Sequence, residues 1–362
     1  MGAELLLLIG TTKGIWTARS DSKRASFDFN GPHLPGSQVY SVAFDGRNQR
    51  ILAGTSSLHW GSVVCRSDDL GETWDEPEEA NVKFPEGSDW SLKRVWQLQP
   101  AGADQPDVVY AGAEPASLFR SEDGGVTFDL MKGLYDHPHR PQWTPGNGGL
   151  CLHSILIHPS DPDKMFVAIS TGGVYRSEDR GDSWTVSNEG VRAQFLPNKY
   201  PEFGQCVHKI AMHPLRPDTL FLQNHWGLYR TDDGAKSWTD IANGVPSDFG
   251  FPMVVHPHDP ETAYIVPLES DGYRCTPEGK CRVYRTRNSG KSWEALTEGL
   301  PQTDAHVTVL RDGMAADTLE PAGIYFGTRT GEVYASKNEG DSWNLIAQHL
   351  PPVMSVKTAV LD

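Results

Sequence analysis

The stretch SEDRGDSW, residues 177–184, decides the fold because close variants of it occur at five other places in the chain. The six octets are SDDLGETW (67–74), SEDGGVTF (121–128), SEDRGDSW (177–184), TDDGAKSW (231–238), TRNSGKSW (286–293) and SKNEGDSW (336–343). Their first residues are 54, 56, 54, 55 and 50 positions apart. A period of this length is typical of one four-stranded propeller blade with its loops. A catalytic cluster is needed once, so we interpret the recurring octet as a structural turn.

Each residue type of the octet has a local role in such a turn. Ser or Thr stands at the first and seventh positions, and Asp or Asn at the third can accept hydrogen bonds from backbone N–H groups. Glycine, at the fifth position in every octet except 231–238, permits a positive φ, and the closing Trp or Phe forms an apolar wedge between neighbouring sheets. The acids and amides assigned this structural role are Asp69, Asp123, Asp179, Asp233, Asn288 and Asn338.

The octet resembles the Asp-box, or BNR repeat, found in sialidases, sortilin-type receptors, some xyloglucan-acting glycosidases and photosystem assembly factors. The resemblance extends over essentially the whole chain and implies a β-propeller. It implies little about function, because these families use one scaffold for unrelated tasks. The Arg-Ile-Pro signature of sialidases does not occur in this sequence, so no catalytic residue is transferred from that family.

Strand-like segments around the octets predict seven blades. Two short alternating segments precede each octet, and upstream of them lies a third segment that is expected to form the inner strand. The expected inner strands are 40–44, 95–100, 153–159, 208–214, 251–257 and 306–311. Residues 5–29 then supply three strands of a seventh blade and residues 354–361 its inner strand. We expect a single all-β domain over 1–362, a seven-bladed propeller of four-stranded antiparallel blades closed by its N- and C-terminal strands.

Composition excludes several classes of function. The formal net charge is −15 and Lys and Arg form no cluster, so a nucleic-acid partner is not expected. No stretch approaches the roughly 20 apolar residues that span a bilayer, and the apolar run near the N-terminus is interpreted as a strand. Five cysteines in 362 residues are too few for a disulfide framework and indicate a cytoplasmic protein. Cys275 and Cys281 flank a turn and could bridge only in an oxidising compartment.

The face opposite the octets is the expected functional face, because it carries the entries to the inner strands and the loops between second and third strands. Histidines of the repeated turns on the octet side are interpreted as turn fillers: His158, His213, His256 and His258. Alignment of the inner strands places these residues at equivalent hub positions: Tyr40, Arg94, His153, His208, Phe251, His306 and, at the seventh, Ser355 or Lys357. The ligand-binding candidates are Tyr40, His59, Trp60, Trp143, His225, Trp226, Phe251, Arg329 and Lys357.

Three chemistries fit these hub residues. Neutral imidazoles of His153, His208 and His306 would suit a divalent metal, Zn²⁺, Mn²⁺ or copper, with one position open. The same residues would suit a carboxylate ligand gripped by Arg94, or the channel would hold only water. Cys151 and Cys206 precede two of the histidines by two residues and would act as thiolate ligands or nucleophile, or simply be buried thiols.

Carboxylates on this face are the candidates for acid–base chemistry, and Glu114 and Asp304 are preferred. The pool is Glu86, Asp89, Glu114, Asp136, Glu202, Asp248, Glu269, Asp271 and Asp304. The catalytic candidates are His153, His208, His306, Arg94, Glu114 and Asp304. Together they predict an enzyme acting on a carbohydrate or another anionic small molecule, by glycoside hydrolysis or metal-assisted elimination. The alternative is a non-catalytic scaffold whose ligand is a protein.

Overall fold

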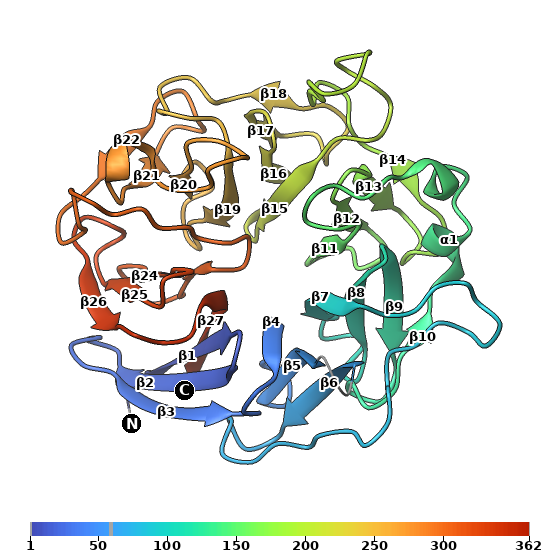
Figure 1. The fold of residues 1–362 in the computed structure, drawn as a ribbon, viewed down its shortest axis with the longest axis horizontal. Coiled ribbons are helices and arrows are strands. Elements are labelled where there is room, and N and C mark those ends of the chain that lie inside the picture. Colours follow the sequence, from blue (N-terminus) through green and yellow to red (C-terminus); the bar gives the residue numbers. More distant parts are fainter. Residues whose placement is uncertain (1, 58–60, 362) are drawn as a thin grey trace.

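Seven β-sheets surround a common centre in the computed structural model, which describes residues 2–57 and 61–361 (Figure 1). Neighbouring strands in every sheet are antiparallel, and the expected seven-bladed all-β propeller is confirmed. Helices in the described ranges are limited to α1 (Lys132–Tyr135) and the 3-10 helices η1 (Arg140–Gln142) and η2 (Pro277–Gly279). None of these helices is long and apolar enough to cross a membrane.

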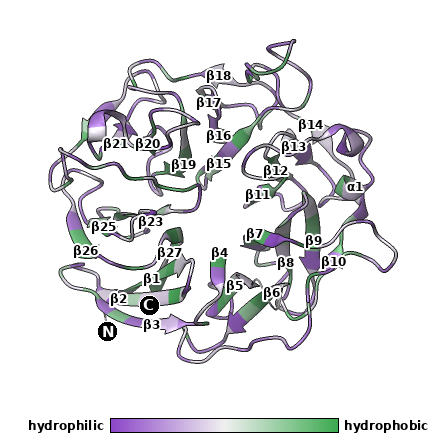
Figure 2. Ribbon diagram, in the orientation of Figure 1, coloured by the Kyte–Doolittle hydropathy of each residue, from purple (hydrophilic) through white to green (hydrophobic). Residues whose placement is uncertain are grey.

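The two ends of the chain share one sheet, which we call the closing blade. Its strands, in spatial order, are β27 (Val353–Leu361), β1 (Glu4–Thr11), β2 (Gly14–Asp21) and β3 (Asp28–His33). β1 pairs with β27 along its whole length, from Glu4 opposite Leu361 to Thr11 opposite Val353. Figure 2 shows hydrophobic stretches in both strands, and seven of the eight residues of β1 are buried. This pairing closes the ring and places β1 inside the sheet, between β27 and β2.

The remaining blades follow in chain order. Blade 1 contains β4 (Gln38–Asp45), β5 (Arg50–Ser57) and β6 (Gly61–Ser67), and the bridge Arg66–Asp75 takes the place of a fourth strand. Blade 2 contains β7 (Arg94–Pro100), β8 (Val109–Glu114), β9 (Ser117–Ser121) and β10 (Asp129–Leu130). Blade 3 contains β11 (Leu152–Ile157), β12 (Met165–Ile169), β13 (Gly173–Ser177) and β14 (Thr185–Val186).

Blades 4 to 6 complete the ring. Blade 4 contains β15 (Val207–His213), β16 (Arg216–Asn224), β17 (Leu228–Thr231) and β18 (Thr239–Asp240). Blade 5 contains β19 (Gly250–Val255), β20 (Ala263–Pro267), β21 (Val283–Thr286) and β22 (Glu294–Leu296). Blade 6 contains β23 (Met314–Ala316), β24 (Ile324–Gly327), β25 (Val333–Ser336) and β26 (Asn344–Ala347).

The octet of blade 3 shows how the turn is held. The Ser177 hydroxyl donates to Asp179 Oδ1 at 2.7 Å and accepts from the Gly181 N–H at 2.8 Å. Asp179 also accepts from the Ser183 N–H at 2.8 Å and from the Ser183 hydroxyl at 2.5 Å. These bonds lower the pKa of Asp179, the Ser183 hydroxyl most of all. The carboxylate therefore satisfies the backbone of its own turn and is not available for chemistry.

The same hydrogen bonds recur in the other five octets, so the structural interpretation of the third position agrees with the geometry. Asp69, Asp123 and Asp233 repeat the carboxylate pattern. In blades 5 and 6 the side-chain N–H of Asn288 and of Asn338 donates to the hydroxyl of the seventh residue instead. The closing aromatic packs between neighbouring blades: Trp184 contacts the apolar cluster of blades 2 and 3, and Trp343 that of blades 5 and 6.

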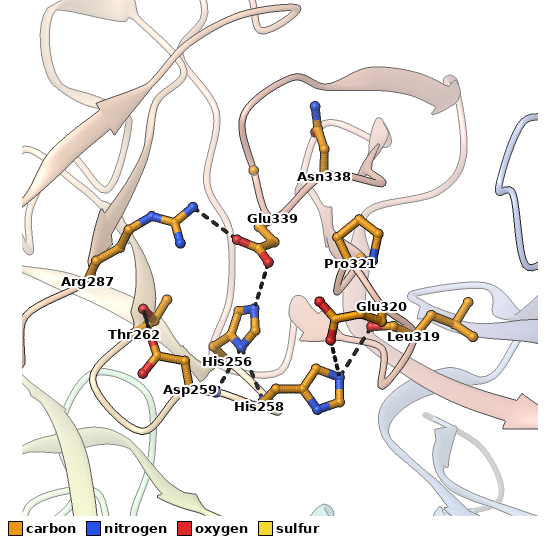
Figure 3. A network of polar contacts seen from close by, with 12 residues as sticks. His256, His258, Asp259, Thr262, Arg287, Leu319, Glu320, Pro321, Asn338 and Glu339 are labelled. Atoms are coloured by element: carbon orange, nitrogen blue, oxygen red, sulfur yellow. Dashed lines mark hydrogen bonds and ion pairs between the residues drawn. The ribbon is translucent and has the colours of Figure 1, made fainter.

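Turn histidines extend these contacts on the octet side (Figure 3). His256 Nδ1 accepts from the backbone N–H groups of His258 and Asp259, both at 3.1 Å. Its Nε2 lies 3.5 Å from Glu339 in the octet of blade 6, and Arg287 of blade 5 donates to the same carboxylate at 3.0 Å. The imidazole thus organises its own turn and contributes to the contact between blades 5 and 6.

Inner strands carry a β-bulge at their hub end, which corrects one predicted alignment. The pairing register shifts around Tyr40 in β4, Trp96 in β7, His153 in β11 and His208 in β15. Trp96, two residues after Arg94, therefore occupies the position predicted for Arg94. The predicted alignment of this strand was wrong by two residues, because alternation alone does not show where an extra residue enters a strand.

The predicted inner strand at 306–311 is also wrong, because β23 (Met314–Ala316) takes that place in blade 6. Residues 305–309 instead line a loop of blade 5: the Thr276 N–H donates to the Val307 carbonyl at 3.1 Å and the Ala305 N–H to the Gly279 carbonyl at 2.9 Å. Val309 is fully buried in the cluster of blades 5 and 6. The apolar alternation of this segment reflects packing against the neighbouring loop.

The octet geometry predicts that Asp179→Ala destabilises the protein and that Asp179→Asn does so much less. Alanine removes both acceptors and costs about 1 kcal/mol of unfolding free energy, a modest value because the turn is exposed. Asparagine keeps the acceptor and matches blades 5 and 6. Urea unfolding of both variants measures the difference, and equal losses for Ala and Asn would contradict the assigned role.

Candidate functional site

A cavity of about 1280 Å³ lies at the hub, where the first residues of the inner strands meet the loops between second and third strands. All seven blades contribute to its wall. Tyr40 of blade 1, Arg94 of blade 2, His208 of blade 4 and Phe251 of blade 5, which were predicted at the hub, line this cavity. The cavity is therefore on the face opposite the octets.

Glu114, at the end of β8, is the buried carboxylate of one wall. Its Oε2 accepts from Arg94 Nη1 and from the Trp96 indole N–H, both at 3.0 Å. The loop 144–149 passes directly over it, and a side chain at Gly149 would place its Cβ 2.4 Å from Glu114 Oε1. With its φ of +90°, Gly149 is the residue type that this close approach requires. The arrangement fixes one carboxylate and one arginine at the cavity surface.

Arg311 lies between aromatic rings of two other walls. Its guanidinium carbon is 5.2 Å from the centre of the Trp96 ring and 5.5 Å from that of Phe251. Nη2 donates to the Ser170 hydroxyl at 3.3 Å, and Nε has no hydrogen-bond partner among the described residues. Cation–π contacts of this kind are worth about 0.5–2 kcal/mol, and they hold the guanidinium without neutralising it.

Cys206, His208 and His225 form a cluster on the wall supplied by blade 4. His208 Nδ1 is 2.6 Å from the Gly250 carbonyl and its Nε2 is 3.7 Å from Cys206 Sγ. His225 Nε2 is 3.4 Å from Asp271 Oδ2. Burial lowers the pKa of both imidazoles and raises the pKa of Cys206 to about 11. Without a further cation, the cluster therefore consists of neutral imidazoles and a protonated thiol.

Asp312 lines the cavity and is paired with two lysines that lie outside the lining. Its Oδ1 is 2.6 Å from Lys209 Nζ and 3.2 Å from Lys357 Nζ. Burial acts to raise the pKa of this carboxyl, but the two ammonium groups outweigh it and hold the pKa well below its ordinary value. Asp312 is thus a fixed negative charge that joins β15 to β27.

Positive charge dominates the cavity although the chain as a whole has a formal net charge of −15. The charged residues of the lining are Arg94, Arg274, Arg311, Arg329, Glu114, Asp271 and Asp312. Two of the carboxylates are already paired, with Arg94 and with the two lysines. Within the described parts of the chain, Arg274, Arg311 and Arg329 are not within ion-pair distance of any carboxylate. The site therefore offers guanidinium groups to a ligand.

Several predicted site residues meet in this cavity. Of the sequence candidates, the lining contains Tyr40, Arg94, Glu114, His208, His225, Trp226, Phe251 and Arg329. His59 and Trp60 lie outside the described residues. The structure thus brings together both arginine candidates, two of the histidine candidates and three of the aromatic ones, and their catalytic or binding roles stay predictions.

The predicted metal set of His153, His208 and His306 is not assembled. His153 is fully buried, with Nε2 on the Val207 carbonyl at 2.9 Å and Nδ1 on the Ser154 hydroxyl at 3.1 Å. His306 is exposed and its Nδ1 is 3.0 Å from the Tyr273 hydroxyl, outside the cavity lining. The cause is the misplaced inner strand of blade 6, which removes His306 from the hub.

Three further candidates lie elsewhere. Trp143 is buried between blades 2 and 3, where its indole N–H donates to the Tyr175 hydroxyl at 3.1 Å. Asp304 is exposed at the start of the loop that replaces the predicted strand. Lys357 contacts the cavity only through Asp312. All five cysteines are free, including Cys275 and Cys281.

Four cavity residues were not predicted from the sequence: Arg274, Arg311, Trp96 and Asp312. Trp96 could have been found from its place two residues after Arg94 on the same strand. Arg311 is the last residue of the predicted inner strand 306–311. It was therefore not considered among the loop residues that could reach the cavity. The pairing of Asp312 with Lys209 and Lys357, which are 103 and 45 residues away, has no local signal in the sequence.

Comparison with known proteins places the chain near glycoside-cleaving enzymes at low identity. No protein-family model matches it. A probable oligoxyloglucan-reducing end-specific xyloglucanase of Neosartorya fischeri is 27% identical over 175 residues, 44% of this chain and 19% of that protein. A xyloglucanase of Hypocrea jecorina is 25% identical over 315 residues, 78% of this chain and 34% of that protein. The chain thus spans no more than about a third of the length of either relative.

A solved structure supports the same fold. The GH74 enzyme of Niastella koreensis superposes with a TM-score of 0.62 at 14% identity, over 97% of this chain and 51% of that chain. At this identity the likeness concerns the propeller fold and not the site.

Buried histidines at the hub predict a loss of stability in mild acid. His153 and His208 have pKa values well below the ordinary 6.5, chiefly because of burial and then because of Arg311. Below about pH 6.5 these histidines take up protons in the unfolded state but stay neutral in the folded state. Their contribution to the unfolding free energy is therefore complete above about pH 6.5 and is lost as the pH falls below it. We expect the unfolding free energy to fall between pH 7 and pH 5 by up to about 1.4 kcal/mol per pH unit for each group.

The measurement is urea unfolding of wild type and His153→Gln at several pH values. The variant's unfolding free energy is expected to depend less steeply on pH. The difference in unfolding free energy between variant and wild type at pH 8 reports the packing change alone. An identical slope in the two proteins would contradict the buried neutral state of His153.

Proposed function

We propose that this protein is an enzyme that cleaves glycosidic bonds in an acidic carbohydrate bound at the hub cavity. The observation that carries the proposal is a set of guanidinium groups without carboxylate partners inside a cavity lined by aromatic rings. Arginine binds carboxylates by charge-assisted, often bidentate hydrogen bonds, and aromatic rings stack on sugar faces. An oligosaccharide that contains uronic acid offers both groups.

Two carboxylates of the lining give the cavity a means of cleavage. Glu114 is fixed by Arg94 and Trp96, and Asp271 lies beside His225 on another wall. Hydrolysis of a glycosidic bond uses one carboxyl as acid and the other as base or nucleophile. Similarity to xyloglucanases supports a carbohydrate substrate for this chain, and the excess of arginine favours an acidic sugar over a neutral one. Elimination remains the alternative reaction on the same substrate class.

Binding tests the substrate class. Isothermal titration with oligogalacturonate and oligoglucuronate is expected to show binding to wild type, and Arg311→Gln is expected to weaken it by about 1.5–3 kcal/mol, the usual range for a hydrogen bond to a charged group. Arg216→Gln on the exposed octet side is the matched control and should bind like wild type. Binding of neutral xyloglucan oligosaccharides that equals or exceeds that of the acidic ones would contradict the proposal.

Product analysis tests the reaction. Hydrolysis produces new reducing ends without an unsaturated sugar, whereas elimination produces the ultraviolet absorbance of an unsaturated uronate. Glu114→Gln is expected to lower the rate by about 10²- to 10⁴-fold, the typical contribution of a general acid or base. Binding without any product, for all of these sugars, would reject the enzymatic part of the proposal.

A protein-binding scaffold is the second candidate. Exposed aromatic side chains, Trp90, Tyr200, Tyr273 and Phe195, are 44–61% accessible, and Phe195 lies 5.1 Å from Trp226 at the cavity wall. Rings of this kind also occur at protein interfaces. Absence of sugar binding in the titrations above, together with a loss of partner binding in a Phe195→Ser variant, would favour this function.

A further inference from the structure

Three donor atoms on the blade 4 wall are close enough to share one metal ion. The ligand atoms of Cys206, His208 and His225 all lie within 4.8 Å of one another. Zinc bonds of about 2.3 Å to sulfur and about 2.0 Å to nitrogen, at tetrahedral angles, place S and N about 3.5 Å apart. The observed distance between Cys206 Sγ and His208 Nε2 is 3.7 Å. This pair already has the spacing of two zinc ligands, and a ring nitrogen of His225 lies within 4.8 Å of both atoms.

Hydrogen bonds from the second ring nitrogens hold both imidazoles in tautomers that can bind metal. The Gly250 carbonyl can only accept, so the 2.6 Å contact fixes the proton of His208 on Nδ1 and leaves the Nε2 lone pair facing Cys206. Asp271 accepts from His225 Nε2 and leaves Nδ1 free of its proton. A backbone carbonyl or carboxylate behind each ligating histidine is the usual outer shell of a zinc site.

Charge and access at the cluster also suit a divalent ion. All three side chains line the cavity, so a fourth position would remain open to water or to an oxygen of the ligand. The Cys206 thiolate formed on binding and the Asp271 carboxylate would supply two negative charges against the two positive charges of the metal. Three protein ligands with one open position are typical of catalytic zinc.

We propose that Cys206, His208 and His225 form a zinc site in the wall of the hub cavity. A thiolate with two imidazoles favours Zn²⁺ over Mn²⁺, which prefers oxygen ligands. The proposal goes beyond carbohydrate cleavage, and zinc uptake is measured without sugar, so the two proposals fail independently.

The test is equilibrium dialysis of chelator-treated full-length protein against Zn²⁺, followed by elemental analysis. Wild type is expected to take up one zinc per chain. Loss of an outer-shell partner typically weakens metal binding roughly 10- to 100-fold, and Asp271→Asn is expected to weaken zinc binding by an amount in this range. Cys206→Ser and His225→Ala each remove a ligand and should weaken zinc binding by more. His306→Gln removes an imidazole outside the cluster and should bind like wild type.

A spectroscopic measurement on wild type does not depend on the variants folding. Co²⁺ in the same site should show the intense near-ultraviolet band of a cobalt–thiolate bond, and Cys206→Ser should abolish this band. Circular dichroism and urea unfolding identify any variant that fails to fold. The proposal is overturned if wild type takes up no zinc, or if zinc binding is unchanged in folded Cys206→Ser and His225→Ala.

Discussion

The pairing of β1 with β27 is the constraint on which the rest of the structure depends. It joins the first and last strands along the whole of β1, and the buried leucines of β1 pack on both faces of this sheet. With the ring closed, the seven inner strands must begin around one axis. Side chains far apart in sequence, such as Tyr40 and Arg329, then line a single cavity. An open ring would not bring these groups together.

The two faces of the closed ring differ in how far their polar groups are already hydrogen-bonded. The octets use their polar side chains within their own turns, as Asp179 does, so these groups are already engaged in internal hydrogen bonds. The hub face retains guanidinium groups that have no carboxylate partner among the described residues, above all Arg311, which lies between two aromatic rings. Arg311 is partly shielded from water, and such a charge without a counter-ion is costly, so an anion would complement this face. The charge of the hub is thus opposite to that of the chain as a whole.

The repeat made the architecture predictable, because six octets at a nearly constant spacing define the blades without any knowledge of contacts. The site was less predictable for two physical reasons. Bulges in the inner strands moved the hub position from Arg94 to Trp96, since an extra residue changes the register without changing the apolar pattern. The segment that contains His306 alternates like a strand but packs as a loop on blade 5. Ion pairs between distant blades, such as Lys209 with Asp312, have no local signal at all.

A crystal structure of the protein soaked with an acidic oligosaccharide tests the central claim most directly, namely that the closed hub binds an anion through unpaired arginines. The account predicts density for the sugar in the cavity, with a carboxylate within hydrogen-bond distance of Arg311 or Arg274 and a sugar face against Trp96 or Phe251. A sugar bound only on the octet side, or a hub whose arginines contact no ligand in crystals with saturating oligosaccharide, would contradict it.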